Sequence, residues 1–154
     1  MSTGDQNVTD IARPTRGLKN KNPGNIRFNP KTDWKGQEGQ DNRGFVIFDT
    51  DINGIRADVI NIHTHWSRDG QNTIRKLIQS YAPPTENNTA NYIDFVVTKV
   101  GKPADETIEA FTKLLALSMM KAIIAIEQGV QPYDDTTLYA GIDSAFIHFA
   151  GDQA

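Results

Sequence analysis

Several common features are missing from this chain of 154 residues, and each absence narrows the possibilities. There is no cysteine, which excludes disulfide bonds and thiolate metal sites. No apolar run approaches the roughly 20 residues that a membrane helix needs, and residues 1–16 lack the apolar core of a secretory signal. We therefore expect no membrane association, so that any target outside the cytoplasm would require another component for delivery.

A surplus of basic residues is missing as well. The net charge of -3 argues against general nucleic-acid binding, because domains with that role are normally basic. There is no glycine-rich phosphate loop and no obvious Ser/His/Asp grouping. His63 and His65 are alternate residues of an expected helix and point in different directions, so we expect neither a metal site nor a cofactor.

The composition is that of one soluble globular domain. Hydrophobic residues make up 38% of the chain and charged residues 23%, and the length is too short for two well-packed domains. Residues 1–16 are polar and show no period, which predicts a flexible N-terminal arm. We expect a single domain over residues 17–154.

The pattern of residues predicts a mainly helical protein with one small β element. Gly17–Gly44 is rich in turn-forming residues, and Phe45–Phe48 is typical of a short buried strand, expected to pair with the Ile26 or Trp34 region. Apolar residues recur at spacings of three and four further on, which is typical of helices. The expected helices run between Asp49 and Gly70, from Asn72 or Thr73 to Tyr81, from Thr85 or Asn88 to Val100, from Pro103 to Gln128 with a possible break near Thr112, and from Asp134 or Asp135 to Phe149.

One carboxylate ends the most apolar of these helices. Glu127 follows Ile123, Ile124 and Ile126, and Gly129 allows a sharp turn directly after it. Apolar surroundings penalise the ionised form of a carboxyl group and raise its pKa, which makes it a proton donor near neutral pH. Glu127 is therefore a candidate general acid. The alternative is a solvent-exposed glutamate in the last turn of a helix, which is common.

A second carboxylate is a weaker candidate. Glu38 lies in a polar loop after Trp34, where a pair of acids with Glu127 is conceivable. The alternative is an ordinary exposed loop glutamate. Asp41, three residues later, is weaker still.

Several segments, taken together and in their order along the chain, resemble a known family. They are Arg16–Arg27 (RGLKNKNPGNIR), Trp34–Gly36, Gly44–Phe48, Gly54–Ala57, Tyr81–Tyr92 and Glu127–Tyr133 (EQGVQPY). This set, which covers nearly everything after Thr15, resembles a family of small virion-associated, lysozyme-like proteins of phages and prophages. The resemblance implies a protein of the virion or the infected bacterial host that acts in the periplasm on the cell wall.

The Asn-Pro-Gly-Asn-Ile-Arg loop and the Phe-x-x-Phe strand are also similar to the β region of bacterial glucosaminidases and lytic transglycosylases. In those enzymes the helix that ends in the catalytic glutamate precedes this region, whereas here it follows. The resemblance therefore implies a mainly α (α+β) fold, a lysozyme-like helical domain with a small β-hairpin that is circularly rearranged. Such rearrangements are tolerable when the two termini of a domain lie close together.

This resemblance implies cleavage of the β-1,4 glycosidic bond in the glycan strand of peptidoglycan, by a muramidase or a lytic transglycosylase. Glu127 would be the general acid and Glu38 its potential partner. Amides hydrogen-bond sugar hydroxyls and aromatic rings cover apolar sugar faces, which gives five candidate sugar contacts: Asn22, Asn25, Tyr81, Asn87 and Tyr133. The alternative is a non-catalytic virion structural protein of the same fold that binds glycan or another virion protein.

Overall fold

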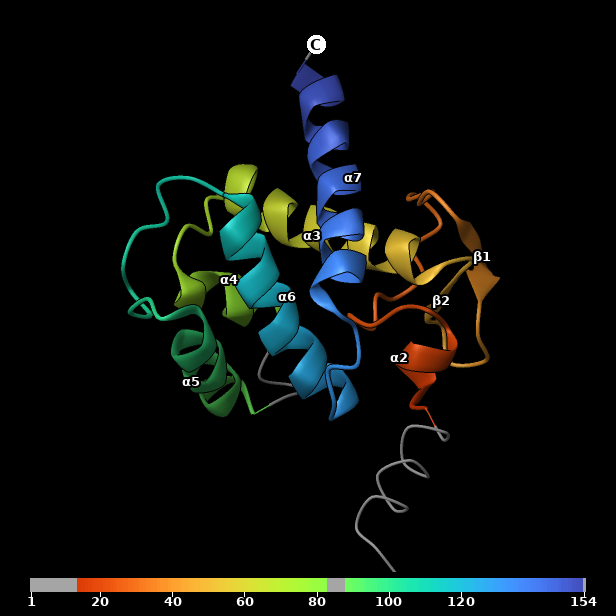
Figure 1. Cartoon of the computed structure of the whole chain (residues 1–154), viewed down its shortest axis with the longest axis horizontal. Coiled ribbons are helices and arrows are strands. Elements are labelled where there is room, and N and C mark those ends of the chain that lie inside the picture. The colour runs from red at the N-terminus through yellow and green to blue at the C-terminus, as the bar shows by residue number, and fades with distance from the viewer. Residues whose placement is uncertain (1–13, 83–87, 154) are drawn as a thin grey trace, which may run out of the picture.

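The structure is a computed structural model that describes residues 14–82 and 88–153. In this part the protein is mainly helical, with one two-stranded antiparallel sheet (Figure 1). The elements, in chain order, are α2 (Arg16–Lys19), β1 (Gln37–Gln40), β2 (Val46–Phe48), α3 (Asp51–Ser67), α4 (Ile74–Tyr81), α5 (Thr89–Val100), α6 (Lys113–Gln128) and α7 (Asp135–Gln153).

Side-chain caps fix where the four middle helices begin. Thr50, Thr73, Asn88 and Thr112 each accept a hydrogen bond from the backbone N–H three residues further on. Such a bond satisfies one of the N–H groups that the first turn of a helix leaves without a partner. These starts agree with the sequence prediction. At the other end, α5 and α6 stop at Gly101 and Gly129, both in the left-handed conformation that glycine adopts most readily.

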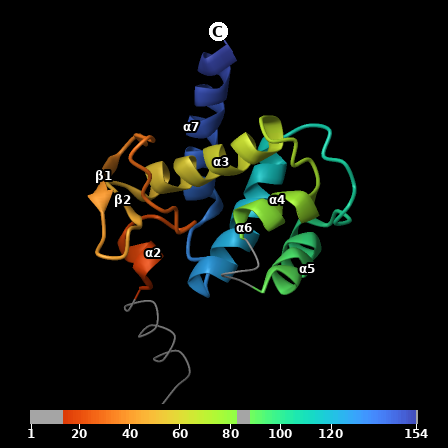
Figure 2. The ribbon, with the colours of Figure 1, turned by 180° about the vertical axis from the view of Figure 1, so that it is seen from behind.

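The helices form the body of the molecule and the β element lies to one side of it. Helix α3 packs across α7, and α6 packs against both α5 and α7. Figures 1 and 2 show α4 and α5 on one flank, with α2, β1 and β2 on the opposite flank. The C-terminal end of α6 therefore points toward the loops of the β flank.

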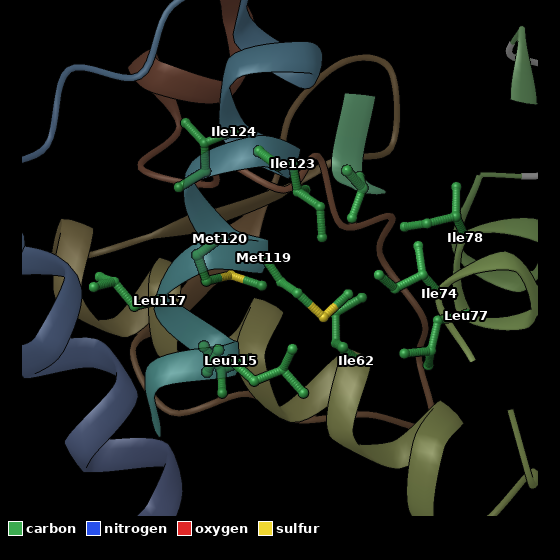
Figure 3. Close-up of a cluster of buried hydrophobic side chains, with 14 of the residues drawn as sticks. Ile62, Ile74, Leu77, Ile78, Leu115, Leu117, Met119, Met120, Ile123 and Ile124 are labelled. Atoms are coloured by element: carbon green, nitrogen blue, oxygen red, sulfur yellow. The ribbon is translucent and has the colours of Figure 1, made fainter. Parts of the chain in front are cut away.

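The main hydrophobic core lies between α3, α4, α5, α6 and α7. Figure 3 shows Met119 and Ile123 of α6 directed toward Ile62 of α3 and the apolar face of α4. A second, small cluster of Ile26, Val46, Phe48 and Ala57 attaches the β element to α3. The main core joins α6 to α3, and the small cluster joins the β element to α3, so both flanks are packed onto α3.

The pairing of the Phe45–Phe48 segment agrees with the expectation in part. Strand β2 pairs with β1, which begins three residues after Trp34, in the register Gln37↔Phe48 and Gln40↔Val46. The Ile26 region pairs with the same segment through a bridge between Arg27 and Phe45, in which the Val46 N–H donates to the carbonyl oxygen of Ile26 at 3.0 Å. The sequence does not predict β1 itself, because Gln37–Gln40 lies in a turn-rich segment and shows no alternation of apolar and polar residues.

Two further boundaries also differ. The stretch from Pro103 to Gln128 is helical only from Lys113. The break expected near Thr112 is confirmed, since Thr112 caps α6, but the segment before it is irregular and not helical. Ile108 and Phe111 in that segment are nevertheless buried. Of the expected arm over residues 1–16, residues 1–13 lie outside the described part, while Arg16 already belongs to α2 and forms an ion pair with Asp41 at 2.9 Å.

Candidate functional site

The site begins with the Asn-Pro-Gly-Asn turn after α2. Asn22 is fully buried, and its side-chain amide donates to the carbonyl oxygens of Ile26 and Val46. Its Oδ1 accepts from the backbone N–H of Ile26 at 2.9 Å. Asn22 therefore shapes the turn and anchors it to β2, and it has no surface left for a sugar. This is a correction to its predicted role as a sugar contact.

The turn rests directly on α3. A Cβ atom added at Gly54 would lie 1.8 Å from the carbonyl oxygen of Lys21, and one added at Gly24 would lie 2.4 Å from the carboxylate of Asp58. Only glycine permits two backbones, or a backbone and a side chain, to approach this closely. The position of the turn is thus set by α3 and not by local sequence alone.

Asn25 links the turn to the C-terminal end of α6 by a hydrogen bond. It adopts a positive φ of 53°, which asparagine tolerates better than most residues. Its Nδ2 donates to Oε1 of Glu127 at 2.9 Å. The hydroxyl of Tyr92, from α5, donates to the other oxygen, Oε2, also at 2.9 Å. Both oxygens of the Glu127 carboxylate are therefore held in place.

Gln128 holds the same turn from the next position of α6. Its Nε2 donates to the carbonyl oxygen of Pro23 at 2.7 Å and lies 3.3 Å from Oδ1 of Asn25. The hydroxyl of Thr15 donates to Gln128 in turn. Since Gln128 is buried, its removal would leave the carbonyl oxygen of Pro23 without this partner.

A cleft opens where Glu127 meets this turn. Its volume is about 450 Å³, and its wall comes from the turn, the loop after it, α3, α4 and α6. Its polar and aromatic lining residues are Asn25, Arg27, Asn29, Thr32, Trp34, Phe45, Asn61, Tyr81 and Glu127. Among the described residues that line it, Glu127 is the one carboxylate. The cleft thus combines amides, hydroxyls, three aromatic rings, one guanidinium group and a single acid.

A larger hollow of about 820 Å³ adjoins the cleft. Thr32, Trp34 and Asn61 line both, so the two hollows lie next to each other along α3, and we refer to them together as the groove. The far part is lined by Lys35, Arg68 and the aromatic ring of Phe149, among others. A groove of this kind suits an extended ligand better than a small one.

The predicted site residues divide into those that the structure brings together and those that it does not. Asn25, Tyr81 and Glu127 line the cleft. Glu38 lies exposed on β1, and Tyr133 is half-buried beside Asp51; neither belongs to the cleft lining. Burial and the neighbouring Asp51 raise the pKa of Tyr133. Asn87 lies outside the described residues.

Asp41, the weaker second candidate, has a structural role. It accepts hydrogen bonds from Arg16, Asn20 and the backbone of Phe45. Desolvation by itself would raise the pKa of Asp41, but these hydrogen bonds outweigh it and hold that pKa well below its usual range. Asp41 therefore stays ionised and secures the start of the domain.

The environment of Glu127 is also less apolar than expected. Its side chain is half-buried, and polar partners hold both oxygens. The carboxyl group that does sit in a fully buried place is Asp58 of α3, which hydrogen-bonds to Tyr81 at 2.9 Å. Burial, reinforced by the charge of Glu127, raises the pKa of Asp58 to about 7 against the opposing hydrogen bond from Tyr81.

Sequence reasoning missed Tyr92, Gln128 and Asp58 as parts of the site. A signal existed for Asp58, because an acid stands among the buried positions of α3 between Ala57 and Val59. Tyr92 stands among the buried residues of α5, and burial together with Glu127 raises its pKa. No local pattern marks Gln128, whose partners are more than 100 positions away in the chain.

No family model matches the chain. It is 33% identical to Protein P5 of Pseudoalteromonas phage PM2 over 141 residues, which make up 90% of this chain and 86% of that protein. The chain belongs to the family of this phage protein. The match spans most of both chains. A bacteriophage origin, expected from the resemblance above, is thereby supported.

Two further observations concern the described residues. In residues 14–82 and 88–153, no three His, Asp or Glu side chains are grouped so as to hold a metal ion. No helix of the same part is long and apolar enough to cross a membrane.

Proposed function

We propose that this phage protein binds the glycan strand of bacterial peptidoglycan in the groove and cleaves its β-1,4 glycosidic bond with Glu127 as the general acid. The observation that carries the proposal is the position of the Glu127 carboxylate, in the wall of the cleft and fixed by Asn25 and Tyr92. Positioning of this kind is what proton transfer to a bound substrate requires.

The lining of the groove suits a sugar polymer. The rings of Trp34 and Tyr81 offer flat apolar surfaces, and Asn29, Thr32 and Asn61 offer hydrogen-bonding groups. The cleft and the adjoining hollow share Thr32, Trp34 and Asn61 as lining residues, which supports a binding site for several sugar units on one side of the scissile bond. A small hydrophobic ligand would leave most of these polar groups without partners.

The number of acids in the cleft favours one mechanism over the other. Hydrolysis with paired carboxylates needs a second acid across the bond, and none of the described lining residues besides Glu127 is an acid. We therefore propose attack by a hydroxyl of the substrate sugar itself, as in lytic transglycosylases. Glu127 gives its proton to the glycosidic oxygen as the bond to the anomeric carbon breaks. The attacking hydroxyl then closes an anhydro ring, and its proton passes to the Glu127 carboxylate.

A second candidate function is that of a non-catalytic virion structural protein with the same fold, which binds glycan or another virion protein. The relationship to Protein P5, a protein of a bacteriophage, supports this candidate. In this case Glu127 and Gln128 would serve to hold the Asn-Pro-Gly-Asn turn. Both candidates place the protein in the virion or in the infected host, and the enzymatic one acts on the cell wall in the periplasm.

The experiment compares the wild type with Glu127→Gln on permeabilised Gram-negative cells and on purified peptidoglycan. Glutamine can accept from Asn25 and donate to the Tyr92 hydroxyl oxygen, so the fold should be kept while the transferable proton is lost. We expect lysis by Glu127→Gln to be at least ~10²-fold lower than lysis by the wild type. Mass spectrometry of the wild-type products should show sugars that are lighter by one water than the products of hydrolysis, because their ends are anhydro rings.

Binding and lysis, measured together, separate the two candidate functions. The wild type and Glu127→Gln should sediment equally with insoluble peptidoglycan if the groove binds glycan. Sedimentation without lysis by either protein would favour the structural candidate, and equal lysis by both folded proteins would remove Glu127 from the mechanism.

A further inference from the structure

A second acid lies behind the wall of the cleft, out of reach of any substrate. Asp58 is fully buried on α3, packed against Gly24 of the Asn-Pro-Gly-Asn turn. Its Oδ2 is the one buried side-chain oxygen or nitrogen of the described residues without a hydrogen-bond partner. An ionised carboxylate in such a position would have lost its hydration without replacement.

A count of protons indicates which form of Asp58 the site holds. The Tyr81 hydroxyl lies 2.9 Å from two oxygens, the carbonyl oxygen of Gly24 and Oδ1 of Asp58. A hydroxyl carries one proton, and a carbonyl oxygen can only accept. If Asp58 were ionised, the tyrosine could satisfy just one of the two oxygens, and the other contact would be repulsive.

A neutral Asp58 satisfies both contacts at once. Tyr81 then donates to the Gly24 carbonyl oxygen, while the carboxyl proton on Oδ1 is donated to the tyrosine oxygen. The unpartnered Oδ2 becomes a neutral carbonyl oxygen, whose burial costs less than that of a charge. The neutral acid thus completes a chain of hydrogen bonds that ends on the backbone next to Asn25.

We propose that Asp58 is held as the neutral carboxylic acid and acts as a positioning residue, and that its ionisation releases the turn that places Asn25 against Glu127. Asp58 itself does not touch the substrate. We call the hydrogen-bonded set of Asp58, Tyr81 and the Gly24 carbonyl group the latch. The latch is pH-sensitive: its hydrogen bonds are complete when Asp58 carries its proton and are weakened when it does not.

Burial and the charge of Glu127 favour the neutral form of Asp58, and among the groups around it only the hydrogen bond with Tyr81 opposes them. Tyr81 of α4, Tyr92 of α5 and Glu127 of α6 are the titratable groups that face it from the neighbouring helices, and the turn presents only the backbone of Gly24. No lysine or arginine of the described residues acts on it to favour the charge. A negative Glu127 disfavours a second negative charge close by.

The sign of the pH effect follows from the pKa of Asp58, which burial raises from 3.8 in the unfolded chain to about 7 in the folded protein. The contribution of the latch to stability is complete below about pH 4 and is lost as the pH rises through about 7. Asp58→Asn keeps a donor for the tyrosine oxygen but cannot ionise. Relative to this variant, the folding equilibrium constant of the wild type should fall by up to ~10³-fold between pH 4 and pH 8.

The test measures urea unfolding of both proteins across this pH range. The difference between the two curves isolates Asp58, because groups such as His63 contribute equally to both. Parallel curves would overturn the proposal. If Asp58→Asn does not fold, carbon-13 NMR of the aspartate carboxyl groups in the wild type decides the matter: a resonance that titrates near pH 7 supports the latch, and aspartates that all titrate below pH 5 overturn it.

These readouts do not depend on glycan cleavage. The functional consequence rests on the proposed function: the wild type should lose lytic activity above about pH 7, and Asp58→Asn should keep activity to higher pH. Lack of lysis at every pH, with the NMR titration near pH 7 intact, would defeat the proposed function and leave the latch standing.

Discussion

Asn25 and Glu127 lie 102 positions apart in the chain, yet the asparagine amide donates a hydrogen bond to the glutamate carboxylate at 2.9 Å. The bond joins the turn of the β flank to the last turn of α6 at the wall of one cleft. The side chain that fixes the turn is therefore the same one that we propose to protonate the substrate. This dual use connects the structural and the chemical roles of the site.

Removal of the Asn25 side chain should affect activity more than stability. Asn25→Gly is the suitable change, because glycine adopts the positive φ of this position without strain. Glu127 loses one of its two partners, and a misplaced catalytic group costs up to ~10²-fold in rate. We expect kcat for peptidoglycan cleavage to fall by about that factor.

Asn91→Ala, on the exposed face of α5, is the matched control and should behave as the wild type. Unchanged kcat in Asn25→Gly would show that the hydrogen bond does not position Glu127.

The neighbouring asparagine should show the opposite behaviour. Asn22→Ala removes a buried side chain that serves the carbonyl oxygens of Ile26 and Val46 and the N–H of Ile26. Each buried group left without a partner costs about 1–3 kcal/mol. We expect the free energy of unfolding, measured with urea, to fall by ~3 kcal/mol. A loss of glycan binding without any loss of stability would restore Asn22 as a sugar contact.

Trp34 should contribute to ligand binding, because it lines both parts of the groove. Trp34→Leu keeps an apolar side chain but removes the flat ring that would cover a sugar face. In the Glu127→Gln background, which prevents cleavage, we expect the affinity for peptidoglycan fragments to fall ~10-fold, equivalent to about 1.4 kcal/mol. Isothermal titration calorimetry measures this change.

Phe95→Leu on α5 removes a half-buried ring away from the groove and is the control. Equal affinities in the two variants would place the ligand elsewhere.

The contact between α3 and the turn has no room for a methyl group. Gly54→Ala would place a carbon 1.8 Å from the carbonyl oxygen of Lys21, so the turn must move away from the helix. Overpacking of this kind costs about 1–3 kcal/mol, and we expect the displaced turn to reduce lysis as well. Thermal and urea unfolding measure the first effect.

Gly151→Ala, which meets nothing within 4 Å, is the matched control and should be neutral or slightly stabilising. Equal stability of the two variants would show that the turn is not seated on α3 as described.

The sequence predicted most of the helices because their signals are local. Thr50, Thr73 and Asn88 stand directly before periodic apolar residues, and their side chains do cap α3, α4 and α5. The sequence did not predict β1, because Gln37–Gln40 has no alternation of apolar and polar residues. This segment is a strand because it pairs with β2. The sequence prediction also overextended the helix before Lys113, because Ile108 and Phe111 are buried without being helical.

The residues of the sequence by themselves determined the composition of the site: an asparagine-bearing turn, one acid at the end of an apolar helix, and aromatic rings nearby. Only the tertiary structure decided which of them meet. It placed Asn25 and Tyr81 in the cleft with Glu127, buried Asn22 within the turn, left Glu38 exposed on β1, and set Asp58 behind the wall. The reason is physical: a hydrogen bond between residues 102 positions apart leaves no periodicity in the chain, and forms only when two hydrophobic clusters pack both flanks onto α3.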